Sequence, residues 1–487
     1  MLKIIKKNEG VNPTEKRLIS LAQNAFLGLW SYPNVYSNEG FSKNKTGKEV
    51  CDLLVVFENN VIIFSDKDIG FNSKIELSVA WKRWFRASVK DSIKQLYGAE
   101  KFIREHNDRL FIDASCETKF PVRFSDETRF FLISVTNNIT SAAQAFFDDV
   151  AKGSSGTLIN VPYYNIEICM EKPFHIGDFF PGRTFVHVFD EFSLKLILTE
   201  LDTISDFVSY LKEKERVIRN GYLGLSPGEE DTLGAYLLGE GTIVDGDDLP
   251  ENHFAIIAEH EWISYTKSIN YQIQLSYKKG SFFWDETIER FSNSILNATV
   301  GIGRDSDFHS HEETVRQLAS ESRRARYYLT RSFLEKFKRV PSDRRSSRLV
   351  ESIDEKGKFY LYIFLPRSKG QSYDDYRLER LSCVQDYSLV AKYRCPDIKK
   401  LILIATESKD SEGRSEDIMY CRFDSPLSKD ERNLARRICK ECKVLSDLIQ
   451  RVCGDNEERT TFIRKDKIER NEPCYCGSGL KYKKCHG

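Results

Sequence analysis

Two β-rich runs with a short polar break between them set the strongest constraint on the fold. Val50–Phe57 and Val61–Lys67 flank Glu58-Asn59-Asn60, a pattern that predicts a β-hairpin. Asn12-Pro13-Thr14-Glu15 upstream is typical of a helix start, with Asn as N-cap and Glu at the third helical position. Apolar residues recur at helical spacing from Leu77 to about His106. This order predicts an α/β domain.

The rest of the chain continues as a mixture of helices and strands. Expected strands are Phe130–Val135, Tyr164–Met170, Thr184–Phe189, Phe254–Glu259, Tyr271–Ser276, Phe359–Leu365 and Leu401–Ala405. Expected helical regions are Ser193–Arg219, as one or two helices, Glu312–Arg339 and Ser428–Cys453. Glycine and acid clusters after Leu223 indicate a boundary. We expect an α/β (α+β multidomain) protein with domains over 1–220 and 221–455, a charged linker over 456–472 and a terminal motif over 473–487.

Composition narrows the classes of function. The 73 Lys and Arg balance 73 Asp and Glu, so any nucleic-acid surface must be a local patch. No apolar stretch reaches the roughly 20 residues of a membrane span, and the first residues are too polar for a secretory signal. Most of the 12 Cys are scattered singly, which fits a reducing compartment. We therefore expect a cytoplasmic protein with no membrane partner. No pattern predicts an oligomeric state.

One cysteine cluster is tight and lies at the carboxyl end. Cys474, Cys476, Cys485 and His486 are four ligands that suit tetrahedral Zn²⁺, and Gly477 and Gly479 let the chain double back between them. Such a loop needs the metal in order to fold. The segment resembles the SEC-C motif, a zinc hairpin that serves as a recognition module. The resemblance implies structural Zn²⁺ and a bound partner, with lysines suited to an acidic protein or nucleic acid, or simply solvated.

Charged side chains near the hairpin suggest a second, catalytic metal. Asp52 opens one strand and Lys67 ends the next, and a helix on each side carries Glu15 or Gln95. Hydrolysis of a phosphodiester needs carboxylates for Mg²⁺ and a cation near the phosphate. An unpaired Asp52 in an apolar strand would be costly to bury, which favours a role. Taken alone, Glu15 also fits a capping box and Gln95 an exposed helix position.

This order resembles the PD-(D/E)xK nuclease superfamily, in particular its nuclease-related and Mrr-type restriction branches, over residues 10–105. The resemblance implies a restriction-endonuclease-like core in which Asp52 and Glu15 hold Mg²⁺, Lys67 is catalytic and Gln95 assists. Ser65 stands where the family has Asp or Glu. Strand alternation puts Ser65 and Lys67 on one face and Asp66 on the other, unless a bulge re-aims Asp66. Asp68 is a further candidate acid, and Cys51 replaces a Pro without chemical consequence.

A basic segment from Arg316 to Arg348 carries interleaved aromatic residues and few acids. Its arginines Arg323, Arg324, Arg326 and Arg331 could follow a phosphate backbone, or pair with acids elsewhere as a solvated helix. The leading hypothesis is a metal-dependent nuclease, acting on DNA rather than RNA, in bacterial antiphage or restriction-type defence. The alternatives are a non-catalytic SEC-C adaptor for a protein or the ribosome, with a degenerate nuclease domain, and a nucleic-acid-binding scaffold.

Overall fold

The structure, a computed structural model, is a mixed α and β protein with several sheets. It describes residues 2–163, 165–247, 249–250, 252–301, 306–409, 411, 415–446, 449–450, 462–463, 481 and 484. The chain divides into two compact units, the first made of Met1–Ser276 with Thr287–Ser320 and the second of Tyr277–Glu286 with Glu321–Gly487. The boundary predicted at residues 220 and 221 falls inside the first unit.

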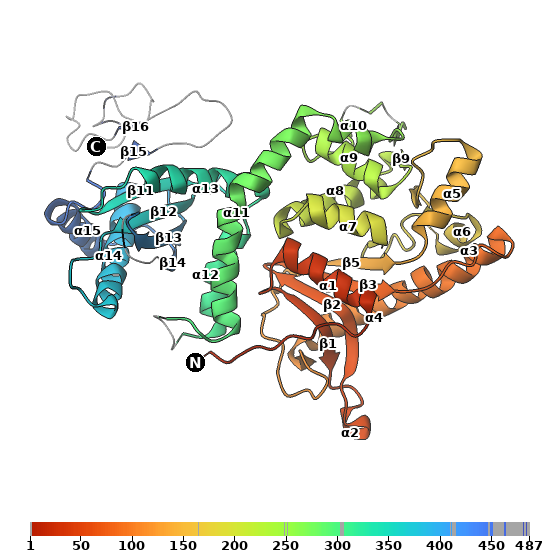
Figure 1. Ribbon diagram of the computed structural model, residues 1–487, viewed down its shortest axis with the longest axis horizontal. Coiled ribbons are helices and arrows are strands. Elements are labelled where there is room, and N and C mark those ends of the chain that lie inside the picture. The colour runs from red at the N-terminus through yellow and green to blue at the C-terminus, as the bar shows by residue number, and fades with distance from the viewer. Residues whose placement is uncertain are drawn as a thin grey trace. The chain divides into compact units, whose positions relative to one another are not determined.

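The first unit is built on a six-stranded sheet of order β4-β1-β2-β3-β5-β8 (Figure 1). Its strands are β1 (Ser31–Ser37), β2 (Lys48–Phe57), β3 (Asn60–Lys67), β4 (Leu110–Phe111), β5 (Arg129–Thr136) and β8 (Val186–Asp190). Strands β1, β2 and β3 are antiparallel neighbours, whereas β5 and β8 run parallel to β3. Short pairs are formed by β6 (Ile159–Asn160) with β7 (His175–Ile176) and β9 (Leu223–Leu225) with β10 (Ala255–Ile256).

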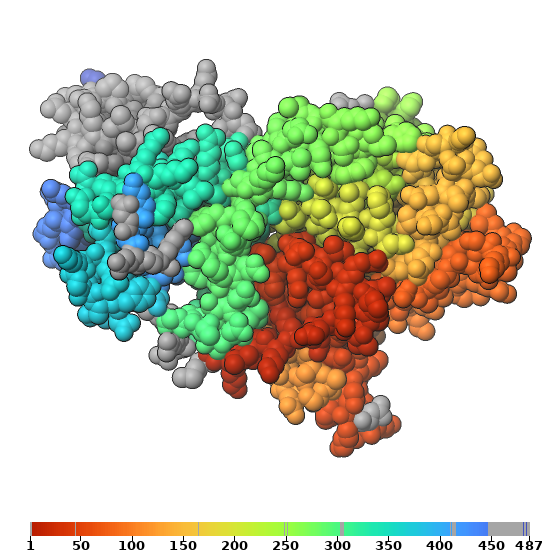
Figure 2. All heavy atoms as spheres, viewed as in Figure 1, coloured from red at the N-terminus to blue at the C-terminus, as the bar shows by residue number. Residues whose placement is uncertain are grey.

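Helices make up most of the remaining first unit. They are α1 (Pro13–Phe26), α2 (Phe41–Asn44), α3 (Leu77–Phe85), α4 (Asp91–His106), α5 (Thr140–Val150), α6 (Ile166–Glu171), α7 (Glu191–Glu200), α8 (Ile204–Arg219), α9 (Glu229–Leu238), α10 (Glu261–Thr266) and α12 (Phe308–Ala319). The long α11 (Ile269–Leu296) contributes to both units, η2 (Asn107–Arg109) is a 3₁₀ turn, and η1 (Arg86–Lys90), a π-helical turn, joins α3 to α4. The residues around α2 project from the surface (Figure 2).

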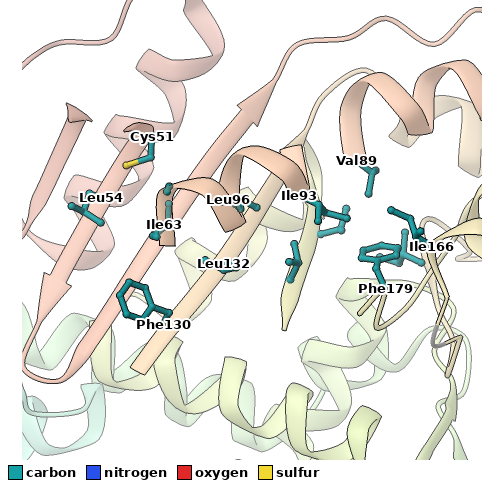
Figure 3. Close-up of a cluster of buried hydrophobic side chains, with 14 of the residues drawn as sticks. Cys51, Leu54, Ile63, Val89, Ile93, Leu96, Phe130, Leu132, Ile166 and Phe179 are labelled. Atoms are coloured by element: carbon teal, nitrogen blue, oxygen red, sulfur yellow. The ribbon is translucent and has the colours of Figure 1, made fainter. Parts of the chain in front are cut away.

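Both faces of the sheet are buried, which explains the near-continuous apolar runs of β2 and β3. On one face, Ile63 and Leu132 pack against Ile93 and Leu96 of α4 (Figure 3). On the other face, Phe26 of α1 lies 6.2 Å from the ring of Phe64. The predicted start of α1 is confirmed, because the Asn12 side chain accepts the backbone N–H of Glu15. The chain crosses from β3 through α4 to β5, and this crossover connection lets β5 lie parallel beside β3.

The second unit contains a four-stranded sheet of order β11-β12-β13-β14. Its strands are β11 (Ser346–Glu351), β12 (Lys358–Leu365), β13 (Lys400–Glu407) and β14 (Glu416–Arg422), and its helices are α13 (Arg323–Lys338), α14 (Tyr373–Arg394) and α15 (Lys429–Glu441). The parallel pair β12–β13 is joined through α14, whose buried residues share one core with the sheet. A short pair, β15 (Ile449–Gln450) with β16 (Phe462–Ile463), follows. None of the described helices is both long and apolar enough to cross a bilayer.

Five sequence predictions were wrong in type or length. Residues 166–171 form helix α6, because Asn165 caps it and its buried residues recur at helical spacing. Residues 271–276 belong to α11, capped by Ser268, so their alternation was misleading. The helix expected over Glu312–Arg339 is two helices, since Ser322 caps a new start at α13. Helix α15 ends at Glu441, before two residues with positive φ, and only residues 255–256 of the strand expected at 254–259 are paired.

Candidate functional site

A pocket of about 1090 Å³ lies at the end of the hairpin where β2 begins and β3 finishes. Asp52 lines it from β2, Ser65 and Lys67 line it from β3, and Gln95 lines it from α4. The structure thus places both Asp52 and Lys67 in the lining of one cavity. The pocket also lies at the carboxyl end of β3, which runs parallel to β5, and the carboxyl ends of parallel strands are a common place for ligand sites.

Asp52 sits where β2 and β3 stop pairing. Their register runs from Phe57↔Asn60 to Leu53↔Phe64, and beyond it the Asp52 Oδ2 accepts the backbone N–H of Asp66 at 2.5 Å. The pKa of Asp52 is raised to about 7, chiefly by burial and also by the charges of Glu49 and Glu15, whereas the Asp66 hydrogen bond and Lys67 oppose the rise. A carboxyl group with this pKa is only partly ionised at neutral pH, and a cation beside it would favour its ionised form.

The pocket is also lined by Ser65 and Lys67 of β3 and by Gln95 of α4. The Ser65 hydroxyl donates to Gln95 Oε1 at 3.1 Å, which ties β3 to α4. The Lys67 ammonium makes no ion pair within the described part of the chain, so its charge is available to an anion. Asp66, by contrast, does not line the pocket: its Oδ1 accepts from the Asn137 amide at 2.8 Å. The alternation predicted along Ser65, Asp66 and Lys67 is therefore present, and no bulge re-aims Asp66.

The other predicted acids are engaged elsewhere. Both carboxylate oxygens of Glu15 serve the start of α1, with Oε2 accepting the Val11 N–H at 2.8 Å and Oε1 accepting the Asn12 amide at 2.6 Å. Glu15 lies close enough to raise the pKa of Asp52, but it does not line the pocket. Asp68 accepts from the Asn138 amide at 2.7 Å. The structure therefore places Asp52, Ser65, Lys67 and Gln95 together and leaves Glu15, Asp66 and Asp68 at its margin.

Sequence reasoning missed two residues of this region, Glu49 and Asn34. Glu49 lines the pocket, and its Oε1 accepts from the Asn34 amide at 2.7 Å. Burial raises the pKa of Glu49, Glu15 adds to the rise, and the Asn34 hydrogen bond and Lys67 lower it. Asn34 is 2% exposed and has a φ of 45° inside β1. A Pro33-Asn34 pair within an otherwise β-forming run was the available signal for such an irregularity.

One face of α4 forms the long wall of the pocket. Lys94, Gln95, Gly98 and Lys101 line it, at the spacing of a single helical face. Lys94 and Lys101 are exposed, and neither makes an ion pair within the described residues. Two unpaired lysines beside Lys67 suit a polyanionic ligand. Among the described residues, no group of three or more His, Cys, Asp or Glu side chains is arranged to hold a metal ion.

Three of the four arginines predicted to bind nucleic acid are paired with acidic side chains. Arg323 and Arg326 are buried in the second unit and bond to the two oxygens of Asp285, at 2.5 and 2.8 Å. For these two the prediction is wrong, because their charges serve the packing of α13 against α11. Arg331 is exposed and pairs with Glu335 at 3.0 Å. Arg324 is exposed on α13, and for it the prediction stands as a prediction.

The predicted zinc ligands Cys474, Cys476, Cys485 and His486 lie outside the described residues. Comparison with known proteins nevertheless identifies their segment, because the SEC-C motif profile matches residues 470–487. This motif binds zinc, which is compatible with a structural Zn²⁺ on four soft ligands.

Several curated relatives match a short stretch of the chain. Protein translocase subunit SecA of Nitrosomonas eutropha is 60% identical over 35 residues, 7% of this chain and 4% of the relative. SecA of Koribacter versatilis is 82% identical over 22 residues, and SecA of Borreliella burgdorferi is 86% identical over 21, each covering 4% of this chain and 2% of the relative. No solved structure matches the chain significantly. The chain thus carries a SEC-C motif, and the rest of its length has no match in these relatives.

Proposed function

We propose that the first unit is a metal-dependent hydrolase of phosphodiester bonds and that its substrate is DNA. The observation that carries the proposal is the meeting of Asp52 and Lys67, from neighbouring strands, in one pocket. The order of helix, hairpin and helix on which the PD-(D/E)xK resemblance rests is kept in space, with Gln95 beside the lysine strand. Likeness to restriction-type nucleases extends the proposal to cytoplasmic defence of a bacterium against foreign DNA.

The donor set suits Mg²⁺. This ion binds carboxylate oxygens, usually one or two, and keeps several waters. Asp52 would hold it, and the raised pKa of Asp52 is what a metal carboxylate shows without its cation. Bound Mg²⁺ would supply an ionised water and neutralise charge on the phosphate. Lys67 would bind a non-bridging phosphate oxygen, Gln95 and Ser65 would keep α4 in place, and Lys94 and Lys101 would contact the flanking phosphates.

Cleavage assays with a matched pair of lysine variants test this proposal. Plasmid and linear DNA should be cut by the full chain with Mg²⁺ or Mn²⁺, and Lys67→Ala should abolish cutting. Lys82→Ala is the control, because Lys82 pairs with Glu171 on the surface away from the pocket and its loss should leave the rate unchanged. Absence of cutting by the wild-type chain on every DNA and RNA substrate would overturn the proposal.

A second candidate is favoured by the SEC-C match alone. In this alternative the zinc hairpin docks the chain on a protein partner or the ribosome, and the Ser65 departure marks a decayed nuclease. Co-sedimentation of the zinc-loaded full chain with purified bacterial ribosomes tests it. The adaptor predicts that sedimentation is lost in Cys474→Ser/Cys476→Ser while DNA is never cut. Cutting that survives this double substitution would favour the hydrolase.

A further inference from the structure

The proposed hydrolase site lacks an obvious second carboxylate on its lysine strand. Ser65 occupies that position, and its hydroxyl is bonded to Gln95. Asp66 faces away from the pocket toward Asn137, and Asp68 is held by Asn138. A Mg²⁺ ion held by Asp52 alone would be bound weakly, so another acid that faces the same pocket is needed.

Glu49 reaches the pocket because the pairing of β1 with β2 is irregular. Val35 pairs with Cys51, but the next residue, Tyr36, pairs with Glu49, so Val50 has no partner on β1. In a regular strand, residues three apart face opposite sides of the sheet. A bulged residue removes that constraint. Glu49 and Asp52 consequently line the same pocket despite their spacing of three.

Asn34 holds Glu49 in this place. Its Nδ2 donates to Glu49 Oε1 at 2.7 Å and to Glu15 Oε2 at 3.4 Å, so one amide nitrogen restrains two carboxylates. Asn34 is buried with a φ of 45°, a conformation that Asn adopts more readily than most residues. Its Oδ1 is buried and has no hydrogen-bond partner within the described residues. Neutral amide donors restrain these acids without neutralising them, which leaves their charge for a cation.

We infer that Glu49 is the second carboxylate ligand of the metal, in place of the acid that Ser65 lacks, and that Asn34 is its positioning residue. The inference rests on the proposed function. Glu49 and Asp52 then supply two oxygen ligands from one strand, and waters complete the shell. Electrostatics agree with this arrangement, because the charge of Glu49 raises the pKa of Asp52, whereas Lys67 lowers the pKa of both carboxyl groups.

Titration calorimetry with Mn²⁺ on the zinc-loaded full chain tests the inference. Wild type should bind one Mn²⁺, and Asp52→Asn and Glu49→Gln should each weaken that binding tenfold or more. Gln keeps an oxygen that can accept from Asn34, so the variant should fold. Glu39→Gln is the matched control, because Glu39 also borders the pocket but pairs with Lys48, and its affinity should stay within twofold.

The outcomes distinguish failure of the Glu49 assignment from failure of the proposed hydrolase. Unchanged binding in Glu49→Gln with weakened binding in Asp52→Asn would overturn the role of Glu49 and leave the hydrolase intact. No binding in wild type would overturn the hydrolase site itself. Asn34→Gly tests the positioning role, since Gly keeps a positive φ but removes the amide. Mn²⁺ binding should then weaken, and this loss should disappear when Glu49→Gln is already present, because Asn34 acts through its hydrogen bond to Glu49. An equal loss in both backgrounds would overturn that role.

Discussion

The pocket of the first unit and helix α13 of the second unit both concentrate charge, but they treat it in opposite ways. On α13, Arg323 and Arg326 share Asp285, and Arg331 pairs with Glu335. In the pocket, the hydrogen bonds that Asp52 and Glu49 accept from described residues come from a backbone N–H and an amide. The arginine charges are neutralised by acidic side chains, whereas the pocket carboxylates form no ion pair with another described residue. Charge that is gathered but not neutralised is therefore the better sign of a binding site.

The largest expected effect comes from removing the acid that two buried arginines share. Asp285→Ala should lower the free energy of local opening at α13 by about 3–5 kcal/mol, because it breaks buried ion pairs. Hydrogen–deuterium exchange of the α13 amides in the full chain measures this. Glu335→Ala, which removes a partly exposed partner, is the control and should change it by under about 1 kcal/mol. Equal effects of the two variants would contradict the expectation that buried ion pairs stabilise α13 more than surface ion pairs do.

Metal should stabilise the first unit, and more at alkaline pH than at acid pH. At a hundredfold excess over its Kd, a ligand adds about 2.7 kcal/mol to the free energy of unfolding. Mn²⁺ needs ionised Asp52, whose pKa is about 7, so the thermal shift should be large at pH 8 and small at pH 5.5. A shift of equal size at both pH values would place the metal elsewhere.

Asp52→Asn should stabilise the metal-free chain by about 1–3 kcal/mol at pH 8, since one pKa unit corresponds to about 1.4 kcal/mol. The folded pKa lies above the ordinary value of 3.8, so the folded state retains a proton that the unfolded state releases. Wild-type stability therefore falls as the pH rises from about 4 to 7. Urea unfolding at pH 4 and pH 8 measures the difference, which should be several-fold smaller at pH 4. Destabilisation at both pH values would show that Asp52 serves the fold.

The smallest expected effects concern DNA binding, and they should distinguish the lysines of α4 from the arginines of α13. Lys94→Ala/Lys101→Ala should weaken DNA binding a few-fold and lower the slope of log affinity against log salt by about 2, one unit per phosphate contact. Arg331→Ala, on the paired surface of α13, should leave both quantities unchanged. Fluorescence anisotropy over a salt series measures them. Loss of binding in Arg331→Ala alone would return the nucleic-acid surface to the second unit.

Local patterns predicted the parts of the fold that local forces determine. The cap at Asn12 and the β2–β3 hairpin depend on neighbouring residues, and so does the convergence of Asp52 and Lys67 across adjacent strands. Residues 271–276 were wrongly predicted to form a strand, because alternation of polar and apolar residues over six positions does not reveal the 28-residue helix that contains them. Packing against distant parts of the chain determines the secondary structure of such segments.

The site residues that sequence missed depend on features no short window contains. Glu49 faces the pocket only because Val50 is bulged out of register with β1 and Asn34 holds the carboxylate from 15 residues away. Arg323 and Arg326 pair with Asp285, which lies 38 and 41 residues away in the sequence. The sequence alone therefore did not show that these arginine charges are already paired. The Ser65–Gln95 bond was equally hidden, although both residues were singled out.

Single-turnover cleavage of a labelled DNA duplex by the zinc-loaded full chain, wild type beside Asp52→Asn, tests the central claim most directly. With Mn²⁺ present, the account predicts that wild type cuts the duplex and that the variant, still folded, is slower by roughly a hundredfold or more. Cutting at the same rate by both chains, or by neither, would contradict it.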